Sequence, residues 1–404
     1  MAPHALISGA GIAGPALAHQ LTARGWKTTV VERFPQRRDE GQNVDIRGVA
    51  REVVRRMGIE DDVRAANTGE IGTRFVRADG SPAASFPVSE SGETDGPTAE
   101  FEILRGELSR ILVERTIDQT DYRFNTEIAA VTDHGDHITA TLQDGTDIDA
   151  DILVIAEGLR SRSRRFVTTE EVNDLGMYFA YITIPRREID DQWWNWQHET
   201  NSRGVHLRPD NLGTIRAVLT FISDVRGLEE LDQTAQTSIL KRTFDDVGGA
   251  APRILAEIDA GAPMYFSAVG QLSNRSWIKG GRIALLGDAA SCNATFGGAG
   301  TSLALIGGYV LAGELDDADD VPAALARYRR VMEPFVDDAP QVRAGVLRLA
   351  NPRTRTGIRV LHAGARLAAS RAVRTITAVT GKGLISIANS APLPDYPDTD
   401  VRLP

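Results

Sequence analysis

Three glycines near the N-terminus have the spacing of a phosphate-binding turn. Gly9, Gly11 and Gly14 form the pattern G-x-G-x-x-G. Glycines in this pattern allow a tight turn, close approach of the backbone to a pyrophosphate, and close packing of the following helix, whose N-terminal amides attract anions. The residues between the last two glycines are Ile12 and Ala13. The motif predicts a dinucleotide site and leaves open whether the dinucleotide is FAD or NAD.

The elements around these glycines are those that such a turn requires. Residues 5–8 form a short apolar run, 14–24 are rich in alanine, and 27–31 form a second apolar run. This order predicts a strand, a helix and a second strand, which is a complete βαβ unit. Glu32 ends the second strand, where its carboxylate can accept hydrogen bonds from a ribose, and Arg33 stands beside it.

A second motif, far along the chain, favours FAD over NAD. Residues 282–286 predict a buried strand that leads into Asp288, which would place a carboxylate beside the hydroxyl-rich ribityl chain of FAD. A glycine-rich run then opens a helix whose free amides would face the electron-rich edge of an isoalloxazine and stabilise its anionic reduced form. The predicted cofactor-contacting residues of this run are Gly298, Gly300, Thr301 and Ser302.

Two further segments complete a pattern that resembles a known family. Arg105 stands at the start of a predicted helix, after an apolar run, and Glu157 and Gly158 open the segment EGLRSRSR. Together with the two glycine motifs, these segments make the chain similar to the group A flavoprotein monooxygenases, the para-hydroxybenzoate hydroxylase-like family. Within that family it resembles the tetracycline-modifying monooxygenases and related actinobacterial hydroxylases. The resemblance spans nearly the whole chain.

The resemblance implies roles for particular residues. Arg105 would contact the FAD, and Glu157 with Gly158 would help to bind both FAD and the reduced nicotinamide. Residues 41–45 resemble the segment that precedes the flavin in the tetracycline-modifying branch, which adds Asp45 to the cofactor site. Arg38 stands at the position of a cofactor-contacting arginine.

The sequence also departs from the common family pattern near the cofactor. Glu157 replaces an aspartate and carries one more methylene, and Ser291 stands where many relatives have histidine. Ala294 and Thr295 stand where a proline is usual, next to the reacting face of the flavin. These differences leave the details of oxygen activation and flavin mobility open.

The resemblance implies an FAD-dependent monooxygenase that consumes NADPH or NADH. It would hydroxylate an aromatic or polyketide-like small molecule through a flavin C4a-hydroperoxide, in antibiotic or secondary metabolism. The cofactor carries the difficult chemistry, so no catalytic residue is predicted. Two alternatives remain open: a flavin-dependent dehydrogenase or reductase without oxygen insertion, and a non-catalytic FAD-binding protein. A flavin halogenase is disfavoured because its Trp-x-Trp-x-Ile-Pro motif is not matched by WNWQHE at residues 194–199.

The substrate would lie between the flavin and a β-rich inserted region. Pockets for small molecules are often lined by aromatic side chains. The candidate wall residues are Trp194, Trp196, His198, His206 and Tyr265, together with Phe296 and Gly297 in the glycine-rich run.

The elements that must hold these residues in place define an α/β fold. We expect a discontinuous Rossmann-like FAD-binding domain of the glutathione reductase type, with an inserted β-rich substrate domain and a helical C-terminal region. The expected boundaries are 1–71, 101–165 and 271–320 for the FAD-binding domain, 72–100 and 166–270 for the substrate domain, and 321–404 for the C-terminal region.

Composition limits the function further. The 404 residues carry a net charge of −10, which would repel a nucleic acid. The one cysteine, Cys292, rules out an intramolecular disulfide and a cysteine-based metal site, and we expect no metal. No apolar run approaches the roughly 20 residues of a membrane span. The apolar start at residues 5–9 runs into the glycine motif without the basic region and cleavage site of a signal peptide, so we expect it to be the first strand. We therefore expect a cytoplasmic enzyme whose partners are a small aromatic substrate and O2. Oligomeric state is not predicted.

Overall fold

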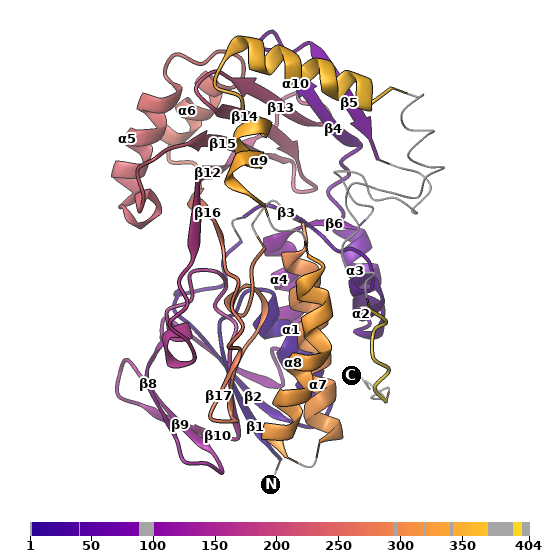
Figure 1. The fold of residues 1–404 in the computed structure, drawn as a ribbon, viewed down its shortest axis with the longest axis vertical. Coiled ribbons are helices and arrows are strands. Elements are labelled where there is room, and N and C mark those ends of the chain that lie inside the picture. The colour runs from indigo at the N-terminus through magenta and orange to yellow at the C-terminus, as the bar shows by residue number, and fades with distance from the viewer. Residues whose placement is uncertain are drawn as a thin grey trace.

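The structure is a computed structural model, and its two halves are each built on one large sheet (Figure 1). It describes residues 2–39, 41–88, 101–293, 298–318, 320–339, 342–370 and 391–397. Four residues singled out in the sequence, Ala294, Thr295, Phe296 and Gly297, lie outside the described residues. The sheet that contains the N-terminal strand is called the first sheet, and the other is called the second sheet.

The first sheet is formed by the N-terminal βαβ unit and by strands that return to it later in the chain. In the described part of the chain its order is β17-β18-β11-β1-β2-β7, and all neighbours are parallel except β17 and β18. The central strands are continuous apolar runs, as expected when both faces of a parallel sheet are covered. The strands are β1 (His4–Ser8), β2 (Lys27–Glu32), β7 (Thr120–Phe124), β11 (Ile152–Ile155), β17 (Ile278–Lys279) and β18 (Ile283–Leu285).

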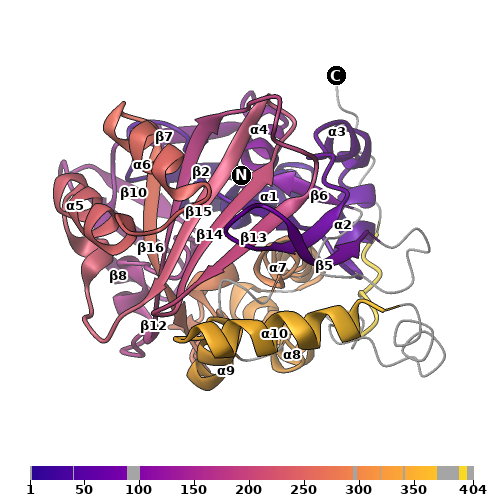
Figure 2. The same cartoon turned by 90° about the horizontal axis from the view of Figure 1, so that it is seen from above.

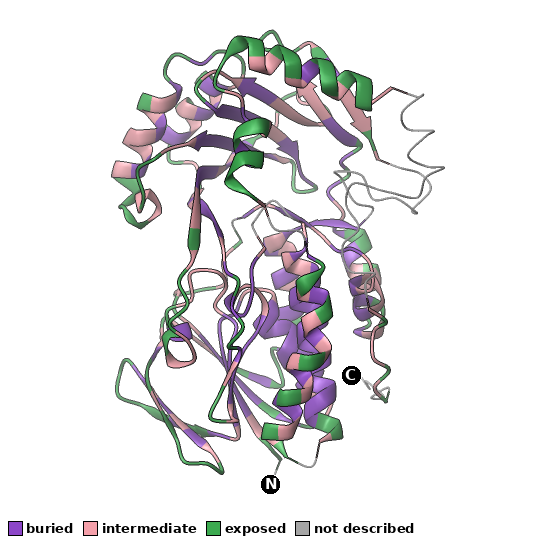
Figure 3. Cartoon of the chain, viewed as in Figure 1, coloured by how far each residue is buried: buried purple, intermediate pink, exposed green. Residues whose placement is uncertain are grey.

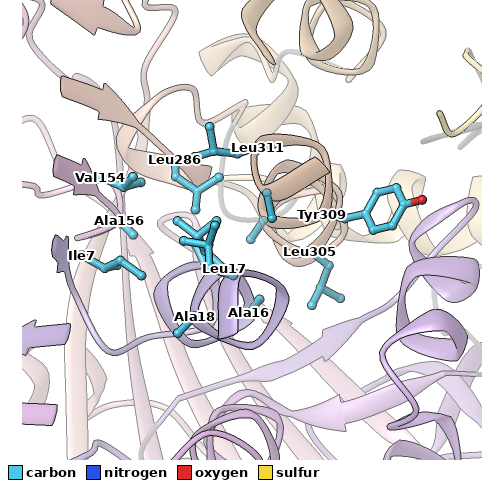
Figure 4. Packing of buried hydrophobic residues seen from close by; sticks show 14 of the residues in the cluster. Ile7, Ala16, Leu17, Ala18, Val154, Ala156, Leu286, Leu305, Tyr309 and Leu311 are labelled. Atoms are coloured by element: carbon cyan, nitrogen blue, oxygen red, sulfur yellow. The ribbon is translucent and has the colours of Figure 1, made fainter. Parts of the chain in front are cut away.

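Two helices, α1 (Ala13–Thr22) and α7 (Gly300–Asp317), form the core beside this sheet. Leu17 of α1 is fully buried and lies among Leu286 and side chains of α7 such as Leu305 (Figure 4). The helices approach closely because residue 308 is a glycine: a Cβ there would lie 3.2 Å from the backbone nitrogen of Leu17. Since α7 is buried along most of its length (Figure 3), its N-terminus is held firmly beside the glycine turn.

Smaller elements surround the first sheet. Strand β6 ends at Leu104 and α4 begins at Arg105, so the predicted strand-to-helix step is confirmed. Helix α8 packs on α7, and the Tyr328 hydroxyl donates to the Leu285 carbonyl at 3.2 Å. These elements are β3 (Asn43–Asp45), α2 (Ala50–Arg56), α3 (Glu60–Ala65), β6 (Glu102–Leu104), α4 (Arg105–Glu114), β8 (Ile128–Asp133), β9 (Ile138–Leu142), β10 (Asp147–Ala150), α8 (Val321–Asp337), and 3-10 helices at Ser163–Phe166 and Gly287–Ala289.

The second sheet combines two separate stretches of the chain. Its order in the described residues is β16-β12-β15-β14-β13-β4-β5, and only β13 and β4 are parallel. Helices α5 and α6 cover one face through a core that includes Phe244, Ile254 and Ile182 (Figure 2). The elements are β4 (Gly72–Val76), β5 (Pro82–Pro87), β12 (Asn173–Pro185), β13 (Trp194–Glu199), β14 (Arg203–Pro209), β15 (Thr214–Ile222), a 3-10 helix at Leu228–Glu230, α5 (Gln233–Phe244), α6 (Ala251–Asp259) and β16 (Met264–Gln271).

The C-terminal helices are shared between the two halves. Helix α8 lies on α7 in the first half. Helix α9 (Ala344–Ala350) then leads to α10 (Arg355–Ala368), which lies along the second sheet beside β5 and β13 (Figures 1 and 2). His362 of α10 and His198 of β13 are both buried, and their ring nitrogens lie 3.2 Å apart. Burial lowers the pKa of both imidazoles, that of His198 to about 4, so one neutral ring can donate to the other.

Buried histidines make the stability of the fold dependent on pH. His19 of α1 is buried, and burial lowers its pKa from 6.5 to about 4. Between these values the unfolded chain binds a proton that the folded chain does not, so stability falls as the pH falls through this window. Between pH 7 and about pH 4.5, we expect the free energy of unfolding to fall by on the order of 2 kcal/mol less in His19→Leu than in the wild type. Denaturant titrations at each pH measure this difference. His134 is exposed, so His134→Leu should leave the pH dependence of the free energy of unfolding unchanged. The same pH dependence in the wild type and in His19→Leu would contradict the prediction.

Candidate active site

A cavity of approximately 500 Å³ lies where the glycine turn, the start of α4, the start of α7 and one face of the second sheet meet. Its size is within the range of small-molecule sites. Most of the predicted cofactor residues line it: Gly9, Gly11, Ile12, Ala13, Glu32, Arg33, Arg38, Asp45, Arg105, Glu157, Gly158, Asp288, Gly298, Gly300 and Thr301. The topology therefore brings together residues from five separated segments of the chain.

The three glycines of the turn have different tasks. A Cβ at Gly9 would lie 2.5 Å from the Ala156 carbonyl oxygen, and one at Gly14 would lie 2.0 Å from the Gly9 carbonyl oxygen. These two glycines are required by the packing of the chain itself. A Cβ at Gly11 would meet nothing nearer than Nη2 of Arg105, at 4.0 Å. The space above Gly11 is therefore open to a ligand that approaches the backbone.

Glu32 ties the glycine turn to the end of β2. Its carboxylate accepts hydrogen bonds from the backbone N–H of Ala10 at 2.8 Å and of Phe34 at 3.0 Å. The carboxylate still lines the cavity, and its remaining lone pairs can accept from a ligand hydroxyl. Arg33 is exposed, with its guanidinium 4.9 Å from the centre of the Phe34 ring.

Arg105 and Asp288 place opposite charges on the cavity wall. Among the described residues, the Arg105 guanidinium has no hydrogen bond or ion pair, and burial lowers its pKa. Burial raises the pKa of Asp288, and Arg105 partly offsets this effect. A Cβ at Gly300 would lie 3.0 Å from Oδ1 of Asp288, so the carboxylate lies against the N-terminus of α7. An arginine that the described residues leave without a hydrogen bond or ion pair is suited to an anionic ligand.

Arg38 lies between the two halves of the molecule. Its guanidinium is 4.3 Å from the centre of the Phe34 ring and 5.2 Å from that of Tyr265 in β16. Within the described residues it forms no ion pair. Arg38 and Arg105 thus give one end of the cavity two cations that the neighbouring described carboxylates do not neutralise by direct contact.

Glu157 is held in place by three hydrogen bonds from the protein. Its carboxylate accepts from the Ser8 hydroxyl at 2.5 Å, the Ser161 hydroxyl at 2.8 Å and the Ser163 N–H at 2.9 Å. Burial opposes ionisation, but these hydrogen bonds outweigh it and lower the pKa of Glu157. The carboxylate therefore braces the strand ends of β1 and β11, while Gly158 lies at the cavity edge with a φ of 79°.

The predicted residues at the start of α7 fall into two groups. Ser302 is fully buried and does not line the cavity; its hydroxyl accepts from the backbone N–H of Arg47 at 2.9 Å. Gly298 and Thr301 line the cavity. Asp45 lies beside Gly298 and pairs with Arg47 at 2.9 Å, and burial raises the pKa of Asp45.

An aromatic row crosses the face of the second sheet that is turned away from α5 and α6. Residues paired across neighbouring strands share a face, and Tyr265, Tyr181, Val218, His206 and Trp196 follow one another in register. The cavity is lined by Tyr181, Trp194, Trp196, Arg208 and Val218 of this sheet, but not by His206 or Tyr265.

His206 and Tyr265 therefore lie next to the wall residues. Burial lowers the pKa of His206 to about 3, so this imidazole is neutral, and its Nε2 lies 3.3 Å from the Thr220 hydroxyl. His198 is bonded to His362 instead of a cavity atom. Three wall residues, Tyr181, Arg208 and Val218, were not predicted from the sequence. Only the pairing of the strands shows that they share a face with Trp196 and Trp194.

Comparison with known proteins decides the family. A family model described as an FAD binding domain matches residues 3–336. The flavin-dependent monooxygenase eupH of Phoma sp is 35% identical, covering 90% of this chain and 91% of that protein. A flavin-dependent monooxygenase of Legionella longbeachae is 34% identical, covering 82% of this chain and 85% of that protein. The chain belongs to the flavin-dependent monooxygenases with an FAD-binding domain.

Solved structures support this assignment. The flavin-dependent monooxygenase described here is similar to tetracycline destructase Tet(55), with a TM-score of 0.76 and 29% identity over 98% of this chain and 99% of that one. It shares its fold with Klebsiella pneumoniae HpxO, solved with FAD and uric acid, at a TM-score of 0.75 and 18% identity over 95% and 98% of the chains. Within the described residues, no helix of this monooxygenase is long and apolar enough to cross a membrane.

The residues of the cavity fit an FAD molecule. Open space above Gly11 suits a pyrophosphate, and Arg105 supplies a cation that the described residues leave without a direct partner. Glu32 and Asp288 line the same cavity and can accept from sugar and ribityl hydroxyls. The free amides at the N-terminus of α7 favour a group that gains negative charge. The monooxygenase therefore has the set of donors and acceptors that the cofactor requires.

Proposed function

We propose that this monooxygenase holds FAD along the glycine turn and hydroxylates an aromatic or polyketide-like small molecule beneath the aromatic row of the second sheet, with NADPH or NADH as reductant. The observation that carries the proposal is one continuous cavity. One end has the open glycine and an arginine without a described partner, and the other end has the wall of Tyr181, Trp194 and Trp196.

The residues of the chain would bind and orient the cofactor and enclose the cavity. Backbone amides at Gly11, the Arg105 guanidinium and the carboxylates of Glu32 and Asp288 would hold the cofactor. Arg38, which contacts Phe34 in one half and Tyr265 in the other, is placed to close the cavity against water at the junction. When bound, FAD would supply the redox chemistry, taking electrons from the reduced nicotinamide and activating O2 for transfer of one oxygen atom to the substrate.

The test uses the FAD-loaded enzyme, a panel of phenols and polyketide aromatics, and isotopically labelled O2. We expect one compound to accelerate NADPH or NADH consumption and to gain one labelled oxygen atom, measured by mass spectrometry. Oxidation of a compound without incorporation of label would contradict the hydroxylation and indicate a dehydrogenase. A protein that takes up no FAD would contradict the cofactor site itself.

A further inference from the structure

The wall of the cavity contains an arginine whose charge is paired with carboxylates of the protein. Arg208 of β14 lines the cavity and is the only cationic residue that the second sheet contributes to the described lining. Its Nε donates to Glu70 at 2.7 Å and its Nη2 donates to Glu102 at 2.6 Å. The side chains of Glu70 and Glu102 are each only 1% exposed, so water screens neither ion pair.

A hydrogen-bond network fixes this cluster in place. The second oxygen of Glu102 accepts from the Thr68 hydroxyl at 2.6 Å and from the Asn43 amide at 2.7 Å. The Arg208 guanidinium also lies 3.8 Å from the centre of the Trp194 ring, within cation–π distance. An arginine held on three sides cannot turn toward a ligand without breaking its ion pairs with two buried carboxylates, which is costly.

The charge balance of this wall is negative. One arginine faces two carboxylates, and Asp45 also acts electrostatically on it. Burial alone would lower the pKa of Arg208, but Glu102, Glu70 and Asp45 raise it above its ordinary value. A ligand carboxylate against this wall would therefore find no available cation among the side chains that the second sheet contributes to the described lining, and Glu70 and Glu102 would repel it although they do not line the cavity. Arg38 and Arg105, which have no ion pair among the described residues, lie at the other end of the cavity.

The wall still offers one neutral donor. Tyr181 of β12 lines the cavity, and among the described residues its hydroxyl has no hydrogen-bond partner. Burial raises the pKa of Tyr181 well above its usual value, so the hydroxyl keeps its proton. It can donate to a ligand oxygen while Trp194 and Trp196 supply apolar ring surface.

We propose that Glu70 and Glu102 are specificity-determining residues. By holding Arg208 in ion pairs, they select uncharged aromatic substrates. Such a substrate would carry an acceptor oxygen, such as a ring carbonyl, which Tyr181 binds. Aromatic carboxylates are bound more weakly. This inference rests on the proposed function only in taking the cavity as the substrate site.

The experiment compares two probes of similar size, 1-hydroxyanthraquinone and anthraquinone-2-carboxylate. Equilibrium dialysis measures their dissociation constants without using any flavin signal, on FAD-loaded and on FAD-free protein. We expect the wild type to bind the neutral probe at least tenfold more tightly than the carboxylate. Equal affinities, or failure of both probes to bind, would overturn the inference whether or not the protein takes up FAD.

Two variants and one matched control make the test specific. Glu70→Gln leaves Arg208 with one carboxylate partner, so the preference for the neutral probe should fall at least tenfold through tighter binding of the carboxylate. Glu114→Gln, at a surface pair with Arg110, is the matched control and should keep the wild-type preference. Tyr181→Phe should weaken the neutral probe about five- to tenfold and leave FAD uptake unchanged. An unchanged preference in Glu70→Gln, with wild-type thermal unfolding, would refute the role of Glu70.

Discussion

Replacing Gly11 by valine should give a folded protein that does not retain FAD. A Cβ at this position has Nη2 of Arg105, at 4.0 Å, as its nearest contact. The valine would instead fill the space in which a pyrophosphate must approach the backbone. We expect visible flavin absorbance to be lost after desalting, while the free energy of unfolding of the FAD-free protein changes by no more than about 1 kcal/mol.

Gly14→Ala is the matched comparison for this result. Its single added carbon would lie 2.0 Å from the Gly9 carbonyl oxygen, so the start of α1 must shift. We expect destabilisation of at least about 2 kcal/mol, seen in denaturant titrations of the FAD-free protein. If Gly11→Val retained FAD with wild-type affinity, the assignment of the open space to the cofactor would be wrong.

Arg105→Met should raise the dissociation constant for FAD about 100-fold. Removing one member of a buried charge pair costs roughly 2–5 kcal/mol, and each tenfold change in affinity corresponds to about 1.4 kcal/mol. The variant without flavin should be as stable as the wild type or more so, because burial disfavours the charge of an arginine that has no ion pair among the described residues. Fluorescence titration of FAD and thermal unfolding of the FAD-free protein measure the two effects.

Arg110→Met, in the same helix, provides the control. Arg110 faces outward and pairs with Glu107 and Glu114. Exposed pairs of this kind contribute roughly 0–1 kcal/mol, so neither FAD binding nor unfolding should change by more than that. A similar loss of FAD affinity in both variants would show that the effect of Arg105 is structural and not a direct contact.

The parts of the site predicted from sequence are those fixed by local pattern. The glycine turn, Glu32 and Arg105 each stand at the junction of a strand with a helix or turn, and a junction can be recognised from apolar periodicity and glycine spacing. The α/β fold was predicted for the same reason, whereas the family was predicted from the resemblance that these motifs carry. The family model over residues 3–336 and the similarity to solved structures confirm both. The individual cofactor contacts and the domain boundaries stay predictions.

The parts that sequence did not predict depend on pairing between distant strands. Tyr181 reaches the cavity because β12 pairs with β15 and β16 in one particular register, and a shift of one residue would turn it to the other face. Arg208 forms ion pairs with Glu70 and Glu102, which lie more than 100 residues before it in the chain. The hydrogen bond from Ser8 to Glu157 likewise depends on the pairing of β1 with β11.

The parallel pairing of β4 with β13 has a consequence for synthesis of the chain. Thr73 pairs with Trp194, so the hairpin of β4 and β5 leaves the ribosome long before its partner strand is made. At typical elongation rates this interval is roughly ten seconds. During that time the inner edge of β4 has no strand to pair with, and such edges promote aggregation. We therefore expect co-expression of a holdase chaperone to raise the yield of soluble protein.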